Sequence, residues 1–275
     1  MRAARHFWQC FQGGQRLLLL VWLLGPAGLS RPVQAQPGFY LASPADTVVA
    51  ALPAGPAYRP TLRQLALPAA LLSVAVLSTK GVGLLPIDGP VQRQVQARFP
   101  GFQTTVDDQL RHVPAAASLA LSLVGVRGVH STVNQGVVFF LAYTINNTLT
   151  SNLKTLTRVE RPYGHDFSSF PSQHSSAAFA AATFLHREYG GRSVWYSIGG
   201  YSVATATATL RVLGNKHWVS DVLAGAGVGI ISTQLAYWAY PAVHRLLVRG
   251  LNDRAVITPL FSNGATGAAL CILLR

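Results

Sequence analysis

The sequence is poor in cysteine and in acidic residues. It contains two cysteines, Cys10 and Cys271, and nine Asp and Glu residues against 22 Lys and Arg residues. Because Cys10 lies in a segment that we expect to be removed, Cys271 would have no partner in the mature chain, and stability would have to come from packing. So few carboxylates also argue against a site that holds two metal ions.

Long uninterrupted apolar runs are also scarce. Half of the residues are hydrophobic and 11% are charged, which is enough apolar material for one large core or for several helices in contact with a membrane. Several apolar stretches have only about 9 to 14 residues, whereas a helix needs about 20 to cross a bilayer. We therefore favour a soluble or peripheral bundle over a protein with many membrane spans.

The apolar stretches indicate an all-α fold. They are rich in Ala and Leu, which favour helices, and none keeps the alternation of apolar and polar residues that marks a strand. Glycines separate them. We predict an all-α helical bundle, with membrane association left open, whose helices include residues 65–77, 115–126, 137–145, 177–185, 194–210 and 222–240.

The first 35 residues are typical of an export signal. Arg2, Arg5 and Arg16 form a basic region, residues 17–24 are apolar, and residues 33–35 have the small-x-small pattern of a cleavage site. The alternative is an uncleaved anchor helix, although the apolar run is closer to about 10 residues than to the roughly 20 that a span requires. We expect cleavage after Ala35 and an exported chain in the periplasm or cell envelope, with its functional site facing the periplasm.

We divide the rest of the chain into three parts. Residues 36–63 are rich in Pro, Ala and Gly, which favours an extended leader. Residues 64–256 would form the helical domain. Residues 257–275 contain Pro259 and several turn-forming residues before a short apolar run, so this tail could be a terminal hairpin or a strand packed on the bundle.

The chain is strongly basic. Its formal charge is +13, and the segment 1–35 carries four arginines and no acid, so its removal leaves +9. Such a balance is found in proteins that bind nucleic acid, anionic lipid headgroups or phosphorylated substrates. The Lys and Arg residues are scattered rather than clustered with aromatic residues, and the chain is expected to be exported, so we expect no nucleic-acid partner.

Three short stretches in the C-terminal half hold polar residues that neither capping nor surface exposure readily explains. In the first, Lys154 and Arg161 are seven residues apart, which places both on one face of a helix that Pro162 would end. Two cations at a helix end predict a phosphate site. The alternative is a solvated basic surface.

The second stretch precedes the apolar run 177–185. Pro171 suits a first helical turn, Ser172 can cap it, and the free backbone N–H groups there would face an anion. His174, one turn into the helix, would lie beside that anion. The alternative is an ordinary N-cap followed by a surface histidine.

The third stretch contains Arg211 at the end of one helix, a turn at residues 214–215 and His217 at the start of the next helix. Asp221 follows four residues later on the same face, where its carboxylate can bind one imidazole nitrogen and leave the other free to attack. The alternative is a core His–Asp pair, which would be unusual so close to Arg and Lys. We see no other cluster of His and Asp in the sequence.

Together the three stretches resemble the type-2 phosphatidic acid phosphatase and vanadium haloperoxidase superfamily, and within it an exported bacterial phosphatase. The resemblance is close over residues 154–221 and looser over 115–240, and three ordered motifs rarely coincide by chance. It implies a helical bundle of the type-2 phosphatidic acid phosphatase kind. It also implies a phosphate site formed by Lys154, Arg161, Arg211, Ser172 and Gln173.

The resemblance further implies a mechanism. His217 would attack phosphorus, Asp221 would orient His217, and His174 would protonate the leaving oxygen and later activate water. Three cations around the equatorial oxygens would stabilise the transition state. We therefore expect no metal and no other cofactor.

Two residues depart from the family pattern. Gln173 stands where Gly is usual, and Leu210 stands where Ser is usual. Gln173 would be strained if its position required a positive φ, whereas a lost Ser removes at most one hydrogen bond. His165, Asp166 and Trp218 lie close to the motifs and are further candidates for the pocket wall, although capping or packing explains each of them equally well.

We predict a metal-independent phosphatase that hydrolyses a phosphate monoester or pyrophosphate through a phosphohistidine intermediate. A lipid phosphate is the favoured substrate because apolar helices adjoin a cationic pocket, and a membrane surface is the expected partner. The alternatives are a vanadium-dependent haloperoxidase, in which His217 would hold vanadate, and a non-catalytic helical module that binds anionic lipid.

Overall fold

The computed structural model describes residues 61–79, 83–252, 255–262 and 265–272. The predicted export signal, and all of the predicted leader except its last three residues, lie outside these ranges. The chain divides into two compact units, one of residues 54–241 and one that joins residues 1–53 to residues 242–275.

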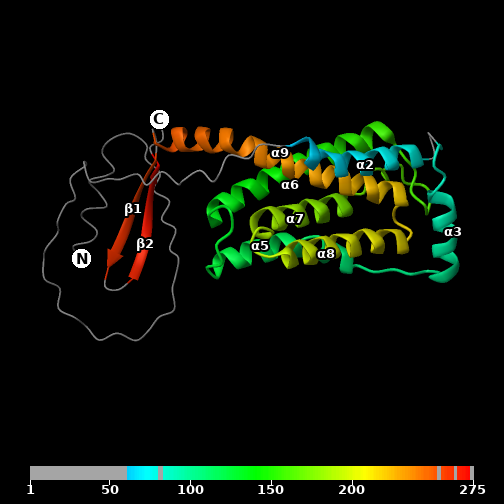
Figure 1. Cartoon of the computed structure of the whole chain (residues 1–275), viewed down its shortest axis with the longest axis horizontal. Helices are drawn as coiled ribbons and strands as arrows, with labels where there is room; N and C mark the ends of the chain where they lie inside the picture. The colour runs from blue at the N-terminus through cyan, green and yellow to red at the C-terminus, as the bar shows by residue number, and fades with distance from the viewer. Residues whose placement is uncertain (1–60, 80–82, 253–254, 263–264, 273–275) are drawn as a thin grey trace, which may run out of the picture. The chain divides into compact units, whose positions relative to one another are not determined.

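The larger unit is a helical bundle, which confirms the predicted fold class (Figure 1). All six predicted apolar stretches fall in its helices, apart from the end of the stretch 115–126. The helices are α2 (Leu62–Ser78), α3 (Asp88–Arg98), α4 (Val106–Leu110), α5 (Val113–Leu123), α6 (Thr132–Thr157), α7 (Gln173–Tyr189), α8 (Val194–Leu213) and most of α9 (Val219–Asn252).

The observed helices differ from the predicted ones in three respects. The sequence does not predict α3 and α4, because α3 is rich in Gln and Arg and α4 has only five residues. α2 begins two residues before the predicted boundary at 64, because the Gln64 side chain accepts a hydrogen bond from the Thr61 backbone N–H at 3.2 Å and closes a capping box. α5 ends at Leu123, and Gly125 then turns the chain with a φ of 89°.

Helix α7 packs against α5, α6 and α8, and it also lies very close to α9. A Cβ atom on Gly229 of α9 would lie 2.2 Å from the Ser176 carbonyl oxygen of α7, and one on Gly225 would lie 2.6 Å from the Ser172 carbonyl oxygen. Only glycine permits such an approach between two backbones. The start of α9 therefore lies directly against the start of α7, which brings the second and third sequence stretches together.

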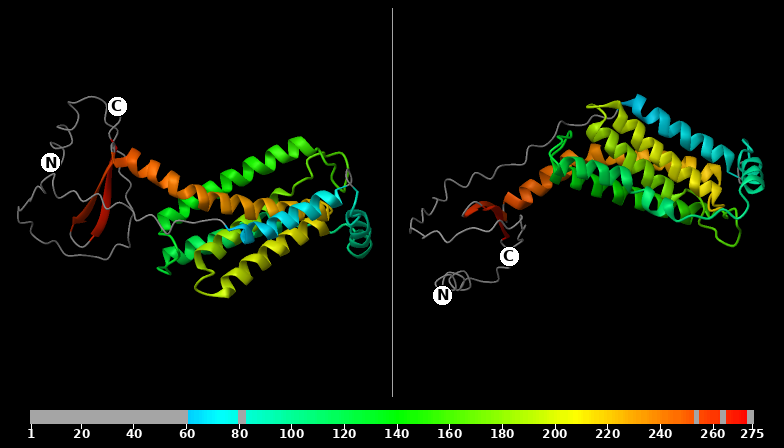
Figure 2. Two further views of the ribbon diagram at one scale, coloured as in Figure 1. Left: turned by 45° about the horizontal axis from the view of Figure 1, so that its top comes forward. Right: turned by 90° about the horizontal axis from the view of Figure 1, so that it is seen from below.

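Helix α3 lies across one end of the bundle in all three views (Figures 1 and 2). Its first residue, Asp88, is buried and accepts hydrogen bonds from the backbone N–H of Ser220 at 2.8 Å and from the Ser220 hydroxyl at 2.6 Å. A carboxylate at the first turn of a helix satisfies donors that have no partner within the helix. Asp88 thus caps α9 and fixes the turn that carries His217.

The described residues of the smaller unit are the end of α9 and a β-hairpin. Strands β1 (Ala255–Ser262) and β2 (Ala265–Ile272) pair antiparallel, from Ala255 opposite Ile272 to Ser262 opposite Ala265. The predicted tail is therefore a hairpin, which is one of the two forms that the sequence allows. The predicted boundary at 257 is two residues too late, since β1 begins at Ala255.

Apolar surface is abundant in the larger unit. In the described part of the chain, one helical segment, Val219–Leu247, is long and apolar enough to cross a membrane, but 78% of its most apolar window is buried, as in the core helix of a soluble protein. Length and composition alone therefore do not assign it to a bilayer. The large apolar side chains that are between 61% and 80% exposed include Leu123, Phe140, Leu156, Trp195 and Trp238.

Candidate active site

The residues of the three sequence stretches come together in the larger unit. Their positions are the end of α6, the following loop, the start of α7, the end of α8 and the start of α9. The imidazole of His217 lies within electrostatic reach of four of them: Arg211, Arg161, Lys154 and His174. The fold thus gathers the predicted catalytic residues around one point, although they span 68 positions from Lys154 to Asp221.

Lys154 and Arg161 are close together, but not on one helix as predicted. α6 ends at Thr157 because Arg158 adopts the left-handed conformation with a φ of 48°, so Arg161 lies in the loop beyond it. Ser168 joins the two cations, since the Lys154 ammonium donates to its carbonyl oxygen and Arg161 Nη2 donates to its hydroxyl at 3.3 Å. A folded loop, rather than helical periodicity, makes this cationic pair.

Asp166 holds Arg161 in place. Its Oδ2 lies 3.0 Å from Arg161 Nε, and its backbone carbonyl accepts a hydrogen bond from the Arg161 N–H at 2.8 Å. Of the other two residues considered for the pocket wall, His165 is exposed, whereas Trp218 is buried and its ring N–H donates to a backbone carbonyl. Asp166 therefore supports the cationic pair, and Trp218 has a packing role.

The second stretch caps α7. Ser172 is the N-cap residue, fully buried, and its hydroxyl accepts a hydrogen bond from the Ser175 N–H at 3.4 Å, as predicted for a helix start. Pro171 lies just outside the helix rather than in its first turn. Gln173 is the first helical residue and does not have a positive φ, so it adds no backbone strain. Its side chain donates to Asn147 Oδ1 at 3.2 Å.

His217 and Asp221 form a buried pair. His217 Nδ1 lies 3.4 Å from Asp221 Oδ2, and the same oxygen accepts hydrogen bonds from the Trp218 N–H at 2.8 Å and from the Ser169 hydroxyl. The Ser169 hydroxyl also lies 3.5 Å from His217 Nδ1. Because Asp221 and Ser169 both face Nδ1, Nε2 is the nitrogen left for a substrate. Ser169 was not predicted, because it belongs to none of the three motifs.

Burial and the surrounding cations keep the His217 imidazole neutral. Its pKa lies well below the ordinary 6.5 because of burial first and then because of Arg211, Arg161 and Lys154. Burial raises the pKa of Asp221 to about 6. Burial also lowers the pKa of Lys154 to about 8, and the neighbouring Arg161 adds to that effect. At pH 7 the site therefore holds a neutral imidazole, an ionised Asp221 and a charged Lys154.

Arg211 is held by an acidic residue that the motifs do not include. Arg211 Nη1 lies 2.6 Å from Asp107 Oδ2, and both side chains are buried. Lys216 approaches the other oxygen of Asp107 at 4.0 Å and donates to the Thr104 carbonyl at 3.0 Å. Arg211 Nε is buried and makes no hydrogen bond with the described residues. A buried donor of this kind can bind an anion.

His174 also contacts an acidic residue of α4. Its Nε2 lies 2.7 Å from Asp108 Oδ1. Asp107, Asp108 and His174 thus form a second His/Asp cluster, with ligand atoms within 4.8 Å of one another, which corrects the expectation of none. The residue types and their spacing would suit a divalent cation. However, Arg211 and Lys216 already place two positive charges beside Asp107, and their repulsion opposes the binding of a metal ion there.

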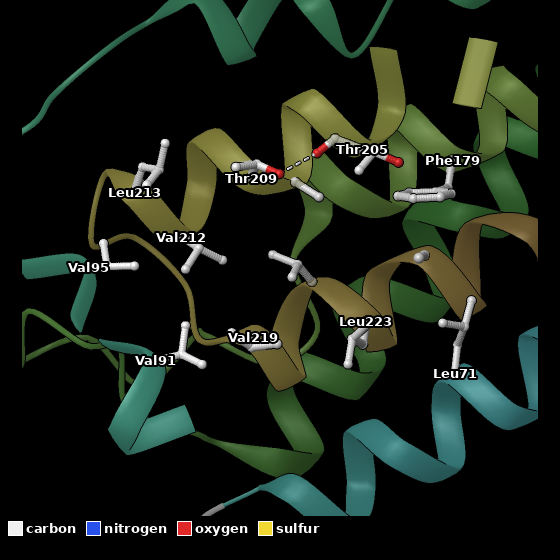
Figure 3. A pocket seen from close by; sticks show the side chains of 13 residues that line it. Leu71, Val91, Val95, Phe179, Thr205, Thr209, Val212, Leu213, Val219 and Leu223 are labelled. Atoms are coloured by element: carbon white, nitrogen blue, oxygen red, sulfur yellow. Dashed lines mark hydrogen bonds between the residues drawn. The ribbon is translucent and has the colours of Figure 1, made fainter. Parts of the chain in front are cut away.

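Two cavities are lined by residues that neighbour the site residues in the sequence. One, of about 470 Å³, has almost wholly apolar walls and is bordered by Val95 of α3, Val212 of α8 and Leu223 of α9 (Figure 3). The other, of about 360 Å³, has walls of mixed polarity and is bordered by Gln96, Asn215 and Lys216, among others. Val212, next to Arg211 in the sequence, thus borders the apolar cavity, and Lys216, next to His217, borders the mixed one.

The chain is similar to known phosphatases and to a known protein family. The family model described as the PAP2 superfamily matches residues 135–245. A lipid A 1-phosphatase of Porphyromonas gingivalis is 38% identical over 154 residues, which cover 54% of this chain and 35% of the relative. The chain thus spans about a third of the length of that curated relative.

Two solved structures are also similar. The crystal structure of Aquifex aeolicus LpxE is 19% identical, with a TM-score of 0.40, and the match covers 52% of this chain and 92% of that one. The first transmembrane PAP2-type phosphatidylglycerolphosphate phosphatase from Bacillus subtilis is 20% identical, with a TM-score of 0.41, over 68% of this chain and 96% of that one.

Proposed function

We propose that the chain is a member of the PAP2 superfamily, whose family model matches residues 135–245, and that it is a metal-independent phosphatase that acts on a lipid phosphate through a phosphohistidine intermediate. The observation that carries the proposal is the environment of His217. This neutral imidazole is buried, Asp221 faces its Nδ1, and three cations lie within electrostatic reach of it. A neutral imidazole is a nucleophile, and the cations attract the anion that it would attack.

The proposed reaction has two steps. His217 Nε2 forms a bond to phosphorus while the bond to the leaving oxygen breaks, and Asp221 stabilises the positive charge that develops on the ring. Lys154, Arg161 and Arg211 bind the equatorial oxygens, as phosphoryl transfer requires. Water then attacks phosphorus, releases phosphate and restores His217. His174 supplies the proton for the first step and accepts one from water in the second.

A lipid is the substrate that the surroundings of the site favour. The apolar cavity of about 470 Å³ borders the turn of α9 that carries Asp221, and large apolar side chains are exposed elsewhere on the unit. Such surface is typical of proteins that contact membranes. The name of the P. gingivalis relative is also that of a lipid phosphatase. We therefore propose a membrane surface as the partner of this chain.

We also propose the division of the chain that the sequence predicts. Residues 1–35 would direct export and be removed, residues 36–63 would act as a leader, and the phosphatase domain would work at the periplasmic face of the envelope. N-terminal sequencing of the protein recovered from membranes would detect cleavage after Ala35, and an intact N-terminus would contradict it.

Phosphate release by the purified full chain tests the proposed function. The substrates are phosphatidate, phosphatidylglycerol phosphate, a polyprenyl pyrophosphate and water-soluble monoesters, each with and without EDTA. We expect the highest kcat/KM with a lipid phosphate, and no loss with EDTA. Release from none of the substrates would contradict the proposal, and loss of activity with EDTA would contradict the metal-independent mechanism. Halide oxidation that requires added vanadate would favour the haloperoxidase alternative.

The titration of Lys154 predicts an alkaline limit to activity. Because burial lowers the pKa of Lys154 to about 8, the positive charge is present below that pH and is lost above it. We expect kcat/KM, which reports the free enzyme, to fall roughly fivefold between pH 8 and pH 9. Lys154→Arg should remove this limb, since Arg stays protonated up to about pH 12.

Lys216→Arg is the matched control for this experiment. It changes another cation near the site but leaves Lys154 in place, so its alkaline limb should stay near pH 8. If the limb stays near pH 8 in Lys154→Arg as well, a group other than Lys154 sets it.

A further inference from the structure

The short helix α4 places two consecutive acidic residues against two different residues of the proposed site. Asp107 contacts Arg211 of α8, and Asp108 contacts His174 of α7. Neither acid belongs to the motifs, and both lie more than 60 positions away from their partners in the sequence. The contact of Asp108 is with the side chain that the proposed function makes the general acid.

We propose that Asp108 is a positioning residue that fixes the tautomer and orientation of His174 for proton transfer. The inference rests on the proposed function, because only a phosphatase mechanism gives His174 a proton to move. Asp108 would act on the reaction through His174, without touching the substrate.

The geometry supports a strong hydrogen bond. His174 Nε2 and Asp108 Oδ1 are 2.7 Å apart, with side-chain exposures of 19% and 44%. A carboxylate can only accept a hydrogen bond, so this contact places the imidazole hydrogen on Nε2. Nδ1 is then the nitrogen that can exchange a proton with the substrate. His217 is held the opposite way, with its Nδ1 facing a carboxylate.

The charges around His174 explain why it needs a carboxylate partner. Burial first, and then Arg211, lower the pKa of His174 to about 4, and Arg111 contributes in the same direction. Asp108 and Asp107 oppose this and favour the protonated ring. Asp108 itself stays ionised, because the hydrogen bond from His174 lowers its pKa. Without Asp108, the cations near His174 would make its protonated form still less accessible.

The proton transfers balance over one turnover. His174 enters the first step in its protonated form, with a hydrogen on each nitrogen. As the bond from His217 Nε2 to phosphorus forms and the bond to the leaving oxygen breaks, the leaving oxygen takes the proton from His174 Nδ1 and departs as an alcohol, which leaves a neutral ring with its hydrogen on Nε2. Water then gives a proton to Nδ1 while its oxygen bonds to phosphorus and the bond to His217 breaks. The hydrogen on Nε2 stays with Asp108 throughout.

The same contacts also fit a different role for α4, in which it blocks the pocket. The two carboxylates could occupy the positions that phosphate oxygens take, so that α4 would block the pocket and have to move before substrate binds. The two readings predict opposite signs for the loss of Asp108, because a positioning residue supports turnover and a blocking residue opposes it.

The test compares full-chain variants on two substrates with different leaving groups. An alkyl phosphate needs its leaving oxygen protonated, whereas p-nitrophenyl phosphate releases a stable anion without that help. We expect Asp108→Ala to lower kcat/KM, which reports the step that releases the leaving group, about 10- to 100-fold for the alkyl phosphate, a loss of the size found when a metal-bound imidazole loses its carboxylate partner. The loss of kcat/KM for p-nitrophenyl phosphate should be much smaller. Asp108→Glu should recover part of the activity.

Gln109→Ala is the matched control, since it changes an exposed neighbour on the same short helix. Nitrogen-15 NMR of the His174 ring should show the hydrogen on Nε2 in the wild type and lose that preference in Asp108→Ala. Equal losses on both substrates, or a gain in activity, would overturn the proposal. If the wild type released no phosphate from any ester, the proposed function itself would fail, which separates the two results.

Discussion

Replacing His217 with alanine is expected to abolish phosphate release, with a loss on the order of 10,000-fold or more. The reason is that the proposed pathway passes through a bond between this imidazole and phosphorus. His174 cannot take over, because the proposed role of its Nδ1 is to exchange the proton of the leaving oxygen. Initial rates on a lipid phosphate and on p-nitrophenyl phosphate would measure the loss, which should be large for both.

Rapid quenching with labelled substrate adds a direct readout. The wild type should carry phosphate on a histidine, and His217→Ala should carry none. His186→Ala is a suitable control, since His186 is an exposed residue towards the other end of α7 whose ring contacts only Ser197 among the hydrogen bonds described. If His217→Ala kept more than about a hundredth of the wild-type rate, the covalent mechanism would be wrong.

Arg211→Ala is expected to damage both activity and stability. Loss of the guanidinium should lower kcat/KM by roughly 100- to 1,000-fold, because a donor to the equatorial oxygens is removed. The substitution also leaves Asp107 buried without its partner at 2.6 Å. Breaking a buried ion pair on one side typically lowers the free energy of unfolding by about 3–5 kcal/mol.

A double substitution separates the two effects. Arg211→Met combined with Asp107→Leu removes both charges, so the free energy of unfolding should return close to the wild-type value while the activity stays low. Chemical denaturation and phosphate release would measure the two quantities, with the exposed Arg192→Ala as control. A double variant that regains activity would contradict a role for Arg211 in binding the substrate.

The sequence predicts the fold class well because the helices that form the bundle are also its apolar segments. α7, α8 and α9 can be located from their Ala- and Leu-rich runs alone. The polar helices α3 and α4 escape this reasoning. α3 packs on a core cluster through two valines, Val91 and Val95, and is otherwise held by specific contacts such as that of Asp88 with Ser220. So short an apolar face does not stand out as an apolar run in the sequence.

The site could be predicted as far as its residues lie in local motifs. His217 and Asp221 are four positions apart, so their pairing was expected from helical geometry. It forms by another route, because α9 begins at Val219 and His217 lies in the turn before it rather than in its first turn. The proximity of Lys154 and Arg161 was also expected from helical geometry, but the left-handed Arg158 ends α6 before Arg161, and the following loop brings the two cations together. Loop conformations of this kind depend on tertiary packing rather than on spacing.

The acidic partners were missed for a different reason. Asp107 and Arg211 are 104 positions apart, and Asp108 and His174 are 66 positions apart. Nothing in the local sequence connects them. One signal was available, because a chain with only nine acidic residues has two of them side by side at 107 and 108.

The absence of side chains at Gly225 and Gly229 lets α7 and α9 approach closely. His174 is carried by α7 and His217 by the segment that enters α9, so the spacing of these two helices also sets the spacing of the two imidazoles that we propose as proton donor and nucleophile. A residue larger than glycine in the contact between α7 and α9 is therefore expected to lower the reaction rate for every substrate.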